Sequence, residues 1–343
     1  MEAFAEWTAD FVVNAAWQIP VIAVASYAAL RLLGRPHPQL EHTVWLGALA
    51  TSVAMPAWAA SRAIGGHPVE VVVDAPWIAA EFLGYAFWAG TAVGVSPFVR
   101  SWNHVRWLRA LPIVGTPSDR LLQINEACSR ELAIRTPQIK ICDVPSPAMV
   151  GSVNPVILLP RSFAAERDDR ILRAAVGHEA AHIARKDFRT NFWTELMSIA
   201  IAAHPVTHWM KTRLKASREK ACDAVVIERV LNPQDYARSV LHLAVSLGGK
   251  SELRLAPGVL DGGAVASRMR ALLDRRAYAT SIAGRCVLVL VAVAFLLTGW
   301  HSAHWLRPGM PEVSLAPPKP PPPPPSPREI KRRLSIANQQ NRQ

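Results

Sequence analysis

Two histidines and a glutamate lie close together in the sequence His178-Glu179-Ala180-Ala181-His182. Residues four apart share one face of a helix, so His178 and His182 can offer two imidazole nitrogens to a single metal ion. Glu179 lies beside them, where its carboxylate can take a proton from a water on that ion. The spacing therefore predicts a hydrolytic zinc site, because zinc lowers the pKa of the attacking water and polarises the carbonyl under attack.

A second pair of residues at helical spacing can complete this site. Catalytic zinc typically has three protein ligands, and Glu219 and Asp223 are again four residues apart, in a helix predicted from about Val206 to Val230. One carboxylate can bind the metal, and the other can accept the free N–H of a ligand histidine and fix its tautomer. Asp187, five residues after His182, is a second candidate for that supporting role.

Each of these candidates also has an ordinary structural interpretation. The two histidines could be unrelated residues on a helix, and Glu219 could belong to a solvated face of charged side chains. Cys222 cannot share a helix face with both neighbouring carboxylates, since a helix turns by about 100° per residue, and we interpret it as a buried thiol. His204 and His208 form another i, i+4 pair, which we interpret as packing or membrane-interface residues and as weak candidates for stabilising a transition state.

The surroundings of the first motif favour a helix. Asp168 and Asp169 are suitable N-cap residues before apolar residues at i, i+3, i+4 spacing. Gly177 is the one weak helix former, at a cost of about 1 kcal/mol relative to Ala, and its small size would allow close approach of another backbone or a substrate. Two short runs, 138–144 and 155–160, predict a β-hairpin or small sheet directly before this helix.

Hydrophobic residues make up 50% of the chain, and they are clustered. Three stretches among the first hundred residues and one near the end have the length and composition of membrane helices, at about 11–33, 43–62, 77–99 and 283–300. Any one of them could be a buried core helix, but three in succession with short connections favour a membrane region. The stretch 192–203 is too short to span and predicts a core helix or one lying against the membrane.

Basic residues indicate the orientation of these predicted spans. Arginines follow the first and third stretches and precede the fourth, so the positive-inside rule places both termini outside and residues 100–284 in the cytoplasm. The acidic start of the chain lacks the basic region of a cleaved signal peptide. We therefore expect four parts: a three-span membrane region (1–99), a cytoplasmic domain (100–282), a fourth transmembrane helix (283–301) and an extracytoplasmic tail (302–343).

Charge and composition restrict the partners. Much of the net charge of +12 lies in the predicted cytoplasmic part near the spans, where it suits anionic lipid head groups. No recognition motif accompanies it, so direct nucleic-acid binding is not expected. The cysteines at 128, 142, 222 and 286 have no metal-ligand spacing, and we expect reduced thiols. The run Pro320–Pro325 predicts a stiff polyproline II spacer, through which the tail could meet an extracytoplasmic signalling partner.

These motifs resemble those of the BlaR/MecR-type membrane metallopeptidases, which sense β-lactam antibiotics. The matching stretches are Ser146-Pro147, Asn154 to Pro160, His178 to Asp187, His204 to Trp209 and Glu219 to Asp223. They cover about residues 140–230, while the flanking spans match in number and orientation. The zinc core is also similar to that of the CAAX-type membrane proteases.

The resemblance implies a mainly α membrane protein with four transmembrane helices and a cytoplasmic, gluzincin-like zinc-peptidase domain. It implies that His178, His182 and Glu219 bind one zinc ion per chain, that Glu179 is the general base, and that Asp223 supports a ligand histidine. Family members cleave themselves or a cytoplasmic transcriptional repressor. This chain departs from the antibiotic sensors, because only about forty residues follow the predicted last span in place of a penicillin-binding domain.

We therefore expect a regulatory zinc metalloendopeptidase in a bacterial inner membrane. Two other interpretations stay open: a non-catalytic membrane signalling or anchoring protein that keeps the peptidase fold, and a quality-control protease for membrane proteins. Self-cleavage is a further hypothesis, with Ser267-Arg268-Met269-Arg270 as an accessible stretch between the zinc domain and the last span.

Overall fold

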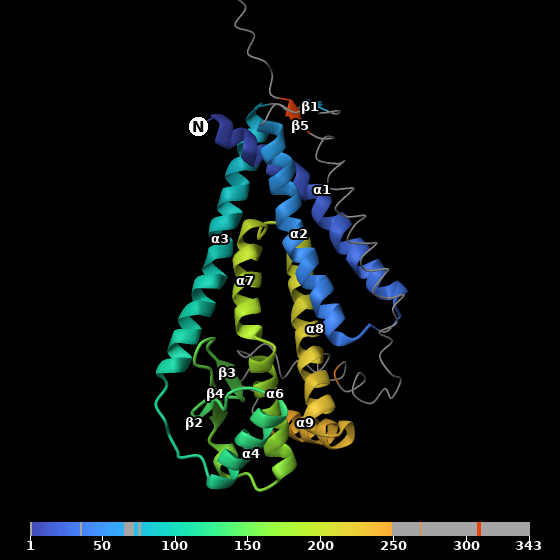
Figure 1. Cartoon of the computed structure of the whole chain (residues 1–343). Helices are drawn as coiled ribbons and strands as arrows, with labels where there is room; N and C mark the ends of the chain where they lie inside the picture. Colours follow the sequence, from blue (N-terminus) through green and yellow to red (C-terminus); the bar gives the residue numbers. More distant parts are fainter. Residues whose placement is uncertain are drawn as a thin grey trace, which may run out of the picture. The chain divides into compact units, whose positions relative to one another are not determined.

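The computed structural model describes residues 2–34, 36–64, 72–74, 77–248, 268 and 307–309. These residues are mainly helical (Figure 1). The helices are α1 (Glu2–Leu32), α2 (Pro38–Ile64), α3 (Trp77–Ala110), α4 (Asp119–Glu131), α5 (Ser162–Ala165), α6 (Asp169–Ala184), α7 (Asp187–Ala200), α8 (Pro205–Arg229) and α9 (Pro233–Gly248). The strands are β1 (Val72–Asp74), β2 (Gln138–Cys142), β3 (Ala148–Val150), β4 (Val156–Pro160) and β5 (Arg307–Gly309).

Two of the predicted membrane helices meet the length and composition of a span in the structure. They are Trp7–Leu32 in α1 and Pro38–Arg62 in α2, which pack against each other through residues such as Ile19 and Trp45. The predicted third span lies in α3, a 34-residue helix that is not among the candidate spans found in the described residues. The predicted fourth span, 283–300, lies outside the described residues.

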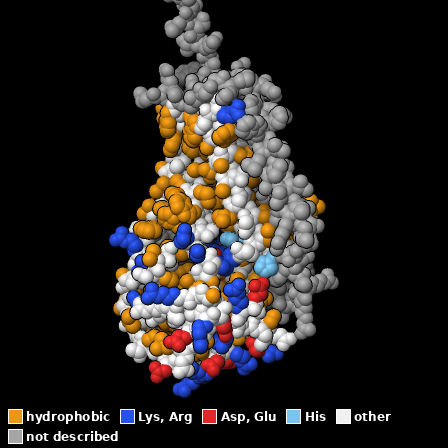
Figure 2. All heavy atoms as spheres, viewed as in Figure 1, with side chains coloured by type: hydrophobic (Ala, Val, Ile, Leu, Met, Phe, Trp, Pro, Cys, Tyr) orange, Lys and Arg blue, Asp and Glu red, His pale blue; other side chains and the backbone are white. Residues whose placement is uncertain are grey.

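Hydrophobic side chains remain exposed along α3. They include Phe82, Tyr85, Trp88 and Val93. In the view of Figure 2, hydrophobic side chains cover the part of the molecule that the long helices form. Charged side chains gather at the opposite end, where α4 and α6 lie in Figure 1. An apolar helix surface of this kind suits contact with lipid.

Helices α7 and α8 form a hairpin that packs among the three long helices (Figure 1). Ile201 and Met210 join the apolar core of α1 and α2. A Cβ atom at Gly90 of α3 would lie 2.6 Å from the Cβ atom of Ala203, so α3 approaches the hairpin closely because Gly90 has no side chain. The stretch 192–203 is thus the C-terminal part of α7 and the hairpin turn, and it does not span. Thr194 and Ser198 are buried, whereas Trp193 and Leu196 are exposed, so the helix has one packed face and one partly apolar exposed face.

The small sheet that was predicted before the first motif is present, with the strand order β2-β4-β3. The two predicted strands do not form a hairpin, because β2 and β4 are parallel, with Ile139 opposite Ile157. Strand β3 returns the chain between them and pairs antiparallel with β4, with Met149 opposite Ile157. Parallel strands need such a return connection. The sequence analysis predicted only two strands and therefore did not include it.

The sheet packs with α4, α6, α8 and α9 around one apolar core. Within it, α6 is buried on most sides, since Leu172, Val176, Ala180 and Ala181 are all inaccessible or nearly so. Cys128, Cys142 and Cys222 are buried free thiols, as expected; Cys286 lies outside the described residues. This core holds α6 and α8 in fixed relative positions, and these two helices carry the predicted metal ligands.

Because α3 and the hairpin are in close contact, we expect two glycine substitutions in α3 to have different effects on thermal stability. Gly90→Ala should lower the thermal unfolding midpoint, because overpacking a well-fitted contact typically costs about 1–3 kcal/mol. Gly84→Ala is the matched control, since a Cβ atom there would meet nothing within 4 Å. Its midpoint, followed by tryptophan fluorescence in detergent, should equal or exceed that of the wild type; equal midpoints for both variants would contradict the contact.

Candidate metal centre

Helix α6 carries the first motif in the predicted geometry. The Asp168 side chain caps the helix by accepting a hydrogen bond from the backbone N–H of Arg170 at 2.8 Å. His178 and His182 lie on one face, with ring centroids 4.9 Å apart. Glu179 is buried at 8% exposure beside them. The two imidazoles and the carboxylate therefore meet at one place on α6.

Helix α8 brings Glu219 to the same place. Its Oε2 atom lies 3.5 Å from Nε2 of His178. One potential ligand atom from each of His178, His182 and Glu219 lies within 4.8 Å of the others, close enough to share one ion. Of the two carboxylates that the sequence offered as third ligand, the structure thus places Glu219 among the donors.

Each of the two predicted ligand histidines is held through its Nδ1 atom. For His182 the partner is Asp187, whose Oδ2 atom lies 2.8 Å away. Lys186, between α6 and α7, has a φ of 59°, and this left-handed residue turns the chain so that Asp187 comes back against α6. A partner on Nδ1 leaves Nε2 of His182 to face an ion, as in carboxylate–histidine–zinc arrangements.

For His178 the support comes from two residues. Its Nδ1 atom lies 3.0 Å from the Tyr236 hydroxyl and 3.3 Å from Oδ1 of Asp223. The Tyr236 hydroxyl itself donates to Oδ1 of Asp223 at 2.7 Å. Asp223 thus takes the predicted supporting position, while Tyr236 of α9 was missed. The sequence offered no signal for Tyr236, because its role depends on how α9 folds back against α6.

A further contact missing from the sequence interpretation is made by Arg268. Its guanidinium binds both oxygens of Asp223, at 2.7 Å each. The stretch around Arg268 was expected to be accessible, but this residue is only 5% exposed, so the expectation is wrong for it. The other three residues of that stretch lie outside the described residues.

The electrostatics of the cluster favour a cation. Burial lowers the pKa of His178, but its hydrogen bonds with Asp223 and Glu219 outweigh this and raise that pKa to about 10. Burial opposes ionisation of Glu219, yet the hydrogen bond with His178 and the nearby imidazoles hold its pKa well below the ordinary value. The arrangement that favours a proton on His178 would equally favour a divalent ion between the imidazoles and Glu219.

Cys222 forms a second group of potential donors with His182 and Asp187. Its Sγ atom lies 3.1 Å from Asp187 Oδ2, to which the thiol donates. Burial and the Asp187 charge raise the pKa of this thiol well above its usual value, whereas zinc binds the thiolate. The geometry therefore agrees with the interpretation of Cys222 as a buried thiol.

His204 and His208 lie away from this cluster. His204 caps α8, where its ring accepts a hydrogen bond from the backbone N–H of Val206 at 3.3 Å. His208 lines a different, polar pocket between α2, α3, α7 and α8. Gly177 allows close approach of a side chain, not of another backbone, since a Cβ atom there would lie 3.1 Å from Cγ1 of Val230. His204 therefore caps a helix and Gly177 packs against a side chain, while His208 is exposed, and neither histidine belongs to the cluster around His178.

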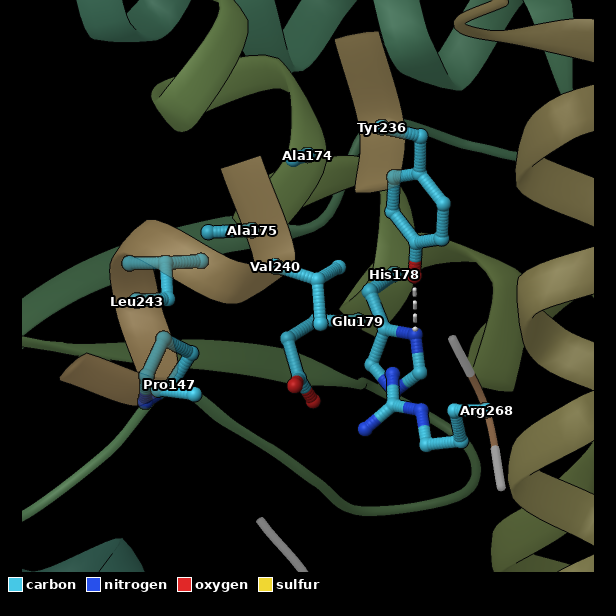
Figure 3. Close-up of a pocket in the computed structure, with 10 residues that line it drawn as sticks. Pro147, Ala174, Ala175, His178, Glu179, Tyr236, Val240, Leu243 and Arg268 are labelled. Atoms are coloured by element: carbon cyan, nitrogen blue, oxygen red, sulfur yellow. Dashed lines mark hydrogen bonds between the residues drawn. The ribbon is translucent and has the colours of Figure 1, made fainter. Parts of the chain in front are cut away.

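A pocket opens beside Glu179 (Figure 3). Its other walls are largely apolar and come from the residue before β3, from α6 and from α9: Pro147, Ala174, Ala175, Val240, Leu243 and Ala244. In Figure 3 the Glu179 carboxylate points into this space, between Pro147 on one side and the guanidinium of Arg268 on the other. A carboxylate beside a largely apolar recess is a suitable arrangement for binding a ligand that has both polar and apolar parts.

Comparison with known proteins agrees with these features. The family described as BlaR1 peptidase M56 matches residues 3–272. The chain belongs to the M56 family. A curated M56-type relative, the regulatory protein BlaR1 of Bacillus licheniformis, is 27% identical over 115 residues, which cover 32% of this chain and 18% of the relative. The family match confirms the resemblance seen in the motifs and makes the chain a relative of membrane-associated peptidases.

The contact between Asp187 and His182 predicts an effect on metal binding. Asp187→Asn should weaken zinc binding by about 10–100-fold, because the charge that orients His182 and increases its basicity is lost. Asp169→Asn is a matched control on α6, since Asp169 lies on the surface, paired with Arg120. Titration against a fluorescent zinc chelator measures both. Wild-type affinity in Asp187→Asn would show that His182 is not a ligand held in this way.

Proposed function

We propose that this M56 protein is a zinc metalloendopeptidase of the bacterial inner membrane, which hydrolyses a peptide bond in a protein substrate on the cytoplasmic side. The observation that carries the proposal is the convergence of His178, His182 and Glu219 beside Glu179 and its pocket. Two imidazoles and one carboxylate form a ligand set that zinc peptidases use, and each imidazole has a hydrogen-bonding partner. The donors therefore fit zinc, one ion per chain.

In hydrolysis, the bound ion and the side chains would have separate roles. When bound, zinc would supply the Lewis acidity that makes a water nucleophilic near neutral pH and polarises the substrate carbonyl. Glu179 would take a proton from the attacking water and later deliver it to the leaving amine nitrogen. Tyr236, Asp223 and Asp187 would keep the two histidines in their tautomers and orientations. The apolar walls of the pocket would exclude competing water.

An extended substrate can be held by strand β3. It is an edge strand of the described sheet, and Pro147 directly before it lines the pocket beside Glu179. Addition of a substrate strand to such an edge would satisfy backbone hydrogen bonds of both chains and bring a peptide bond toward α6.

The proposed membrane arrangement has four spans, with both termini outside and the peptidase domain in the cytoplasm. The two candidate membrane helices and the exposed apolar residues of α3 support it. A regulatory role is supported by the similarity to a protein described as regulatory. We propose that the substrate is the chain itself or a transcriptional repressor, and that an envelope signal reaches the domain through the spans or through a partner of the proline-rich tail.

Glu179→Gln tests this function directly. The amide keeps the size of the side chain but cannot accept the proton, so cleavage should fall by about 10²–10⁴-fold while the zinc content is unchanged. New protein N-termini would be compared by mass spectrometry in cells that make the wild type or the variant. We expect N-termini of a few substrates to disappear in the variant.

Two other outcomes would contradict parts of the proposal, the first bearing on the enzymatic activity and the second on the regulatory role alone. Identical sets of N-termini, with zinc bound in both proteins, would indicate either an enzyme that awaits its signal or a non-catalytic membrane signalling protein that keeps the peptidase fold, and the claim would be reduced to zinc binding. Loss of N-termini from many unrelated membrane proteins would instead indicate a quality-control protease.

A further inference from the structure

Arg268 reaches the metal centre from a part of the chain that follows α9. It lies beyond Gly248, where α9 ends, and it lines the pocket next to Glu179 and His178 (Figure 3). An arginine is among the side chains most rarely buried, and one that is 5% exposed needs a specific partner. That partner is Asp223.

The contact between Arg268 and Asp223 is bidentate. Nε donates to Oδ2 and Nη2 donates to Oδ1, both at 2.7 Å, and the two side chains are 6% and 4% exposed. Two parallel bonds from a planar guanidinium fix both the position and the plane of a carboxylate, which a single ammonium cannot do. The ion pair therefore fixes the orientation of the Asp223 carboxylate and also neutralises its charge.

Asp223 in turn positions His178, a proposed metal ligand. Its Oδ1 atom accepts the Tyr236 hydroxyl and lies 3.3 Å from Nδ1 of His178. Without Arg268, the buried Asp223 carboxylate would lack its counter-charge beside a second carboxylate, Glu219. It would then be free to rotate, to take up a proton or to turn toward the ion, and each of these changes would alter the hydrogen bonding of His178.

We propose that Arg268 is a positioning residue of the metal centre: its guanidinium fixes the Asp223 carboxylate, which together with Tyr236 orients His178 for the ion. The inference rests on the proposed zinc site. If the inference holds, the zinc affinity of the ligands on α6 and α8 depends on a residue that lies outside both helices. A purely structural role, in which the ion pair only attaches the chain beyond α9 to the domain, predicts that zinc affinity is independent of Arg268 in a folded protein.

The test compares Arg268→Met, Arg268→Lys and the control Arg238→Met in the full chain, purified in detergent. Arg238 is an exposed arginine of α9, so its replacement makes the same change of charge away from the site. Zinc affinity is measured by competition with a fluorescent chelator, and folding by the unfolding midpoint of the metal-free protein. We expect zinc affinity to fall by about 10–100-fold in Arg268→Met, less in Arg268→Lys, and not at all in Arg238→Met.

The path through Asp223 is tested by combining the substitutions. If Arg268 acts through that carboxylate, Arg268→Met should cause little further loss of zinc affinity in a chain that already carries Asp223→Asn. Should Arg268→Met fail to fold, Arg268→Lys keeps the buried charge and carries the same comparison. Wild-type zinc affinity in the folded variants, or losses that add fully in the double variant, would overturn the proposal.

The result for Arg268 can be distinguished from the result for the proposed peptidase activity. A wild-type chain that binds zinc but cleaves nothing would refute the peptidase activity, and the affinities would still decide the role of Arg268. A wild-type chain that binds no zinc would refute the proposed function and this inference together.

Discussion

The metal centre depends on two carboxylates one helical turn apart on α8: Asp223, which is buried, and Glu219, whose side chain is 16% exposed. Buried carboxylates need positive charge or hydrogen-bond donors, and nearly every contact in the centre supplies one. Asp223 accepts hydrogen bonds from Tyr236 and Arg268. Burial raises its pKa, but the charge and hydrogen bonds of Arg268 and His178 outweigh this and hold the pKa at about 2. Glu219 has His178 beside it and would share the ion. The apolar core holds α6, α8 and α9 together, and in that arrangement the two carboxylates find their partners.

Helix α8 also connects the metal centre to the candidate membrane helix α2. At its N-terminal end, Trp209 packs edge-on against Trp45 of α2, with ring centroids 5.1 Å apart. Next to the proposed ligand Glu219, Lys220 forms an ion pair with Glu41 of α2 at 3.2 Å. A 25-residue helix is stiff over this distance, so the position of Glu219 is mechanically tied to α2. A shift of this helix would therefore move a proposed metal ligand, which would be a physical route for the proposed envelope signal.

The sequence predicted the parts of the site that depend on local geometry. The i, i+4 spacing placed His178 and His182 on one face of α6, and the same spacing placed Glu219 and Asp223 on α8. The choice of Glu219 over Asp223 as the predicted ligand came from the family resemblance, because periodicity carries no information about how two helices pack. Tyr236 and Arg268 were missed for the same reason, since each reaches the centre through tertiary contacts alone. The parallel pairing of β2 and β4 was missed because a three-residue strand, β3, is too short to stand out in a sequence.

The identity of the metal ligands is the central claim, and X-ray absorption at the zinc edge of the purified, zinc-loaded protein tests it most directly. Two groups of donors lie within reach of an ion, and they differ in one atom type, the sulfur of Cys222. A site of His178, His182 and Glu219 predicts only nitrogen and oxygen neighbours, at about 2.0–2.2 Å, with one zinc ion per chain. A sulfur neighbour at about 2.3 Å would place the ion with Cys222 instead and contradict the account.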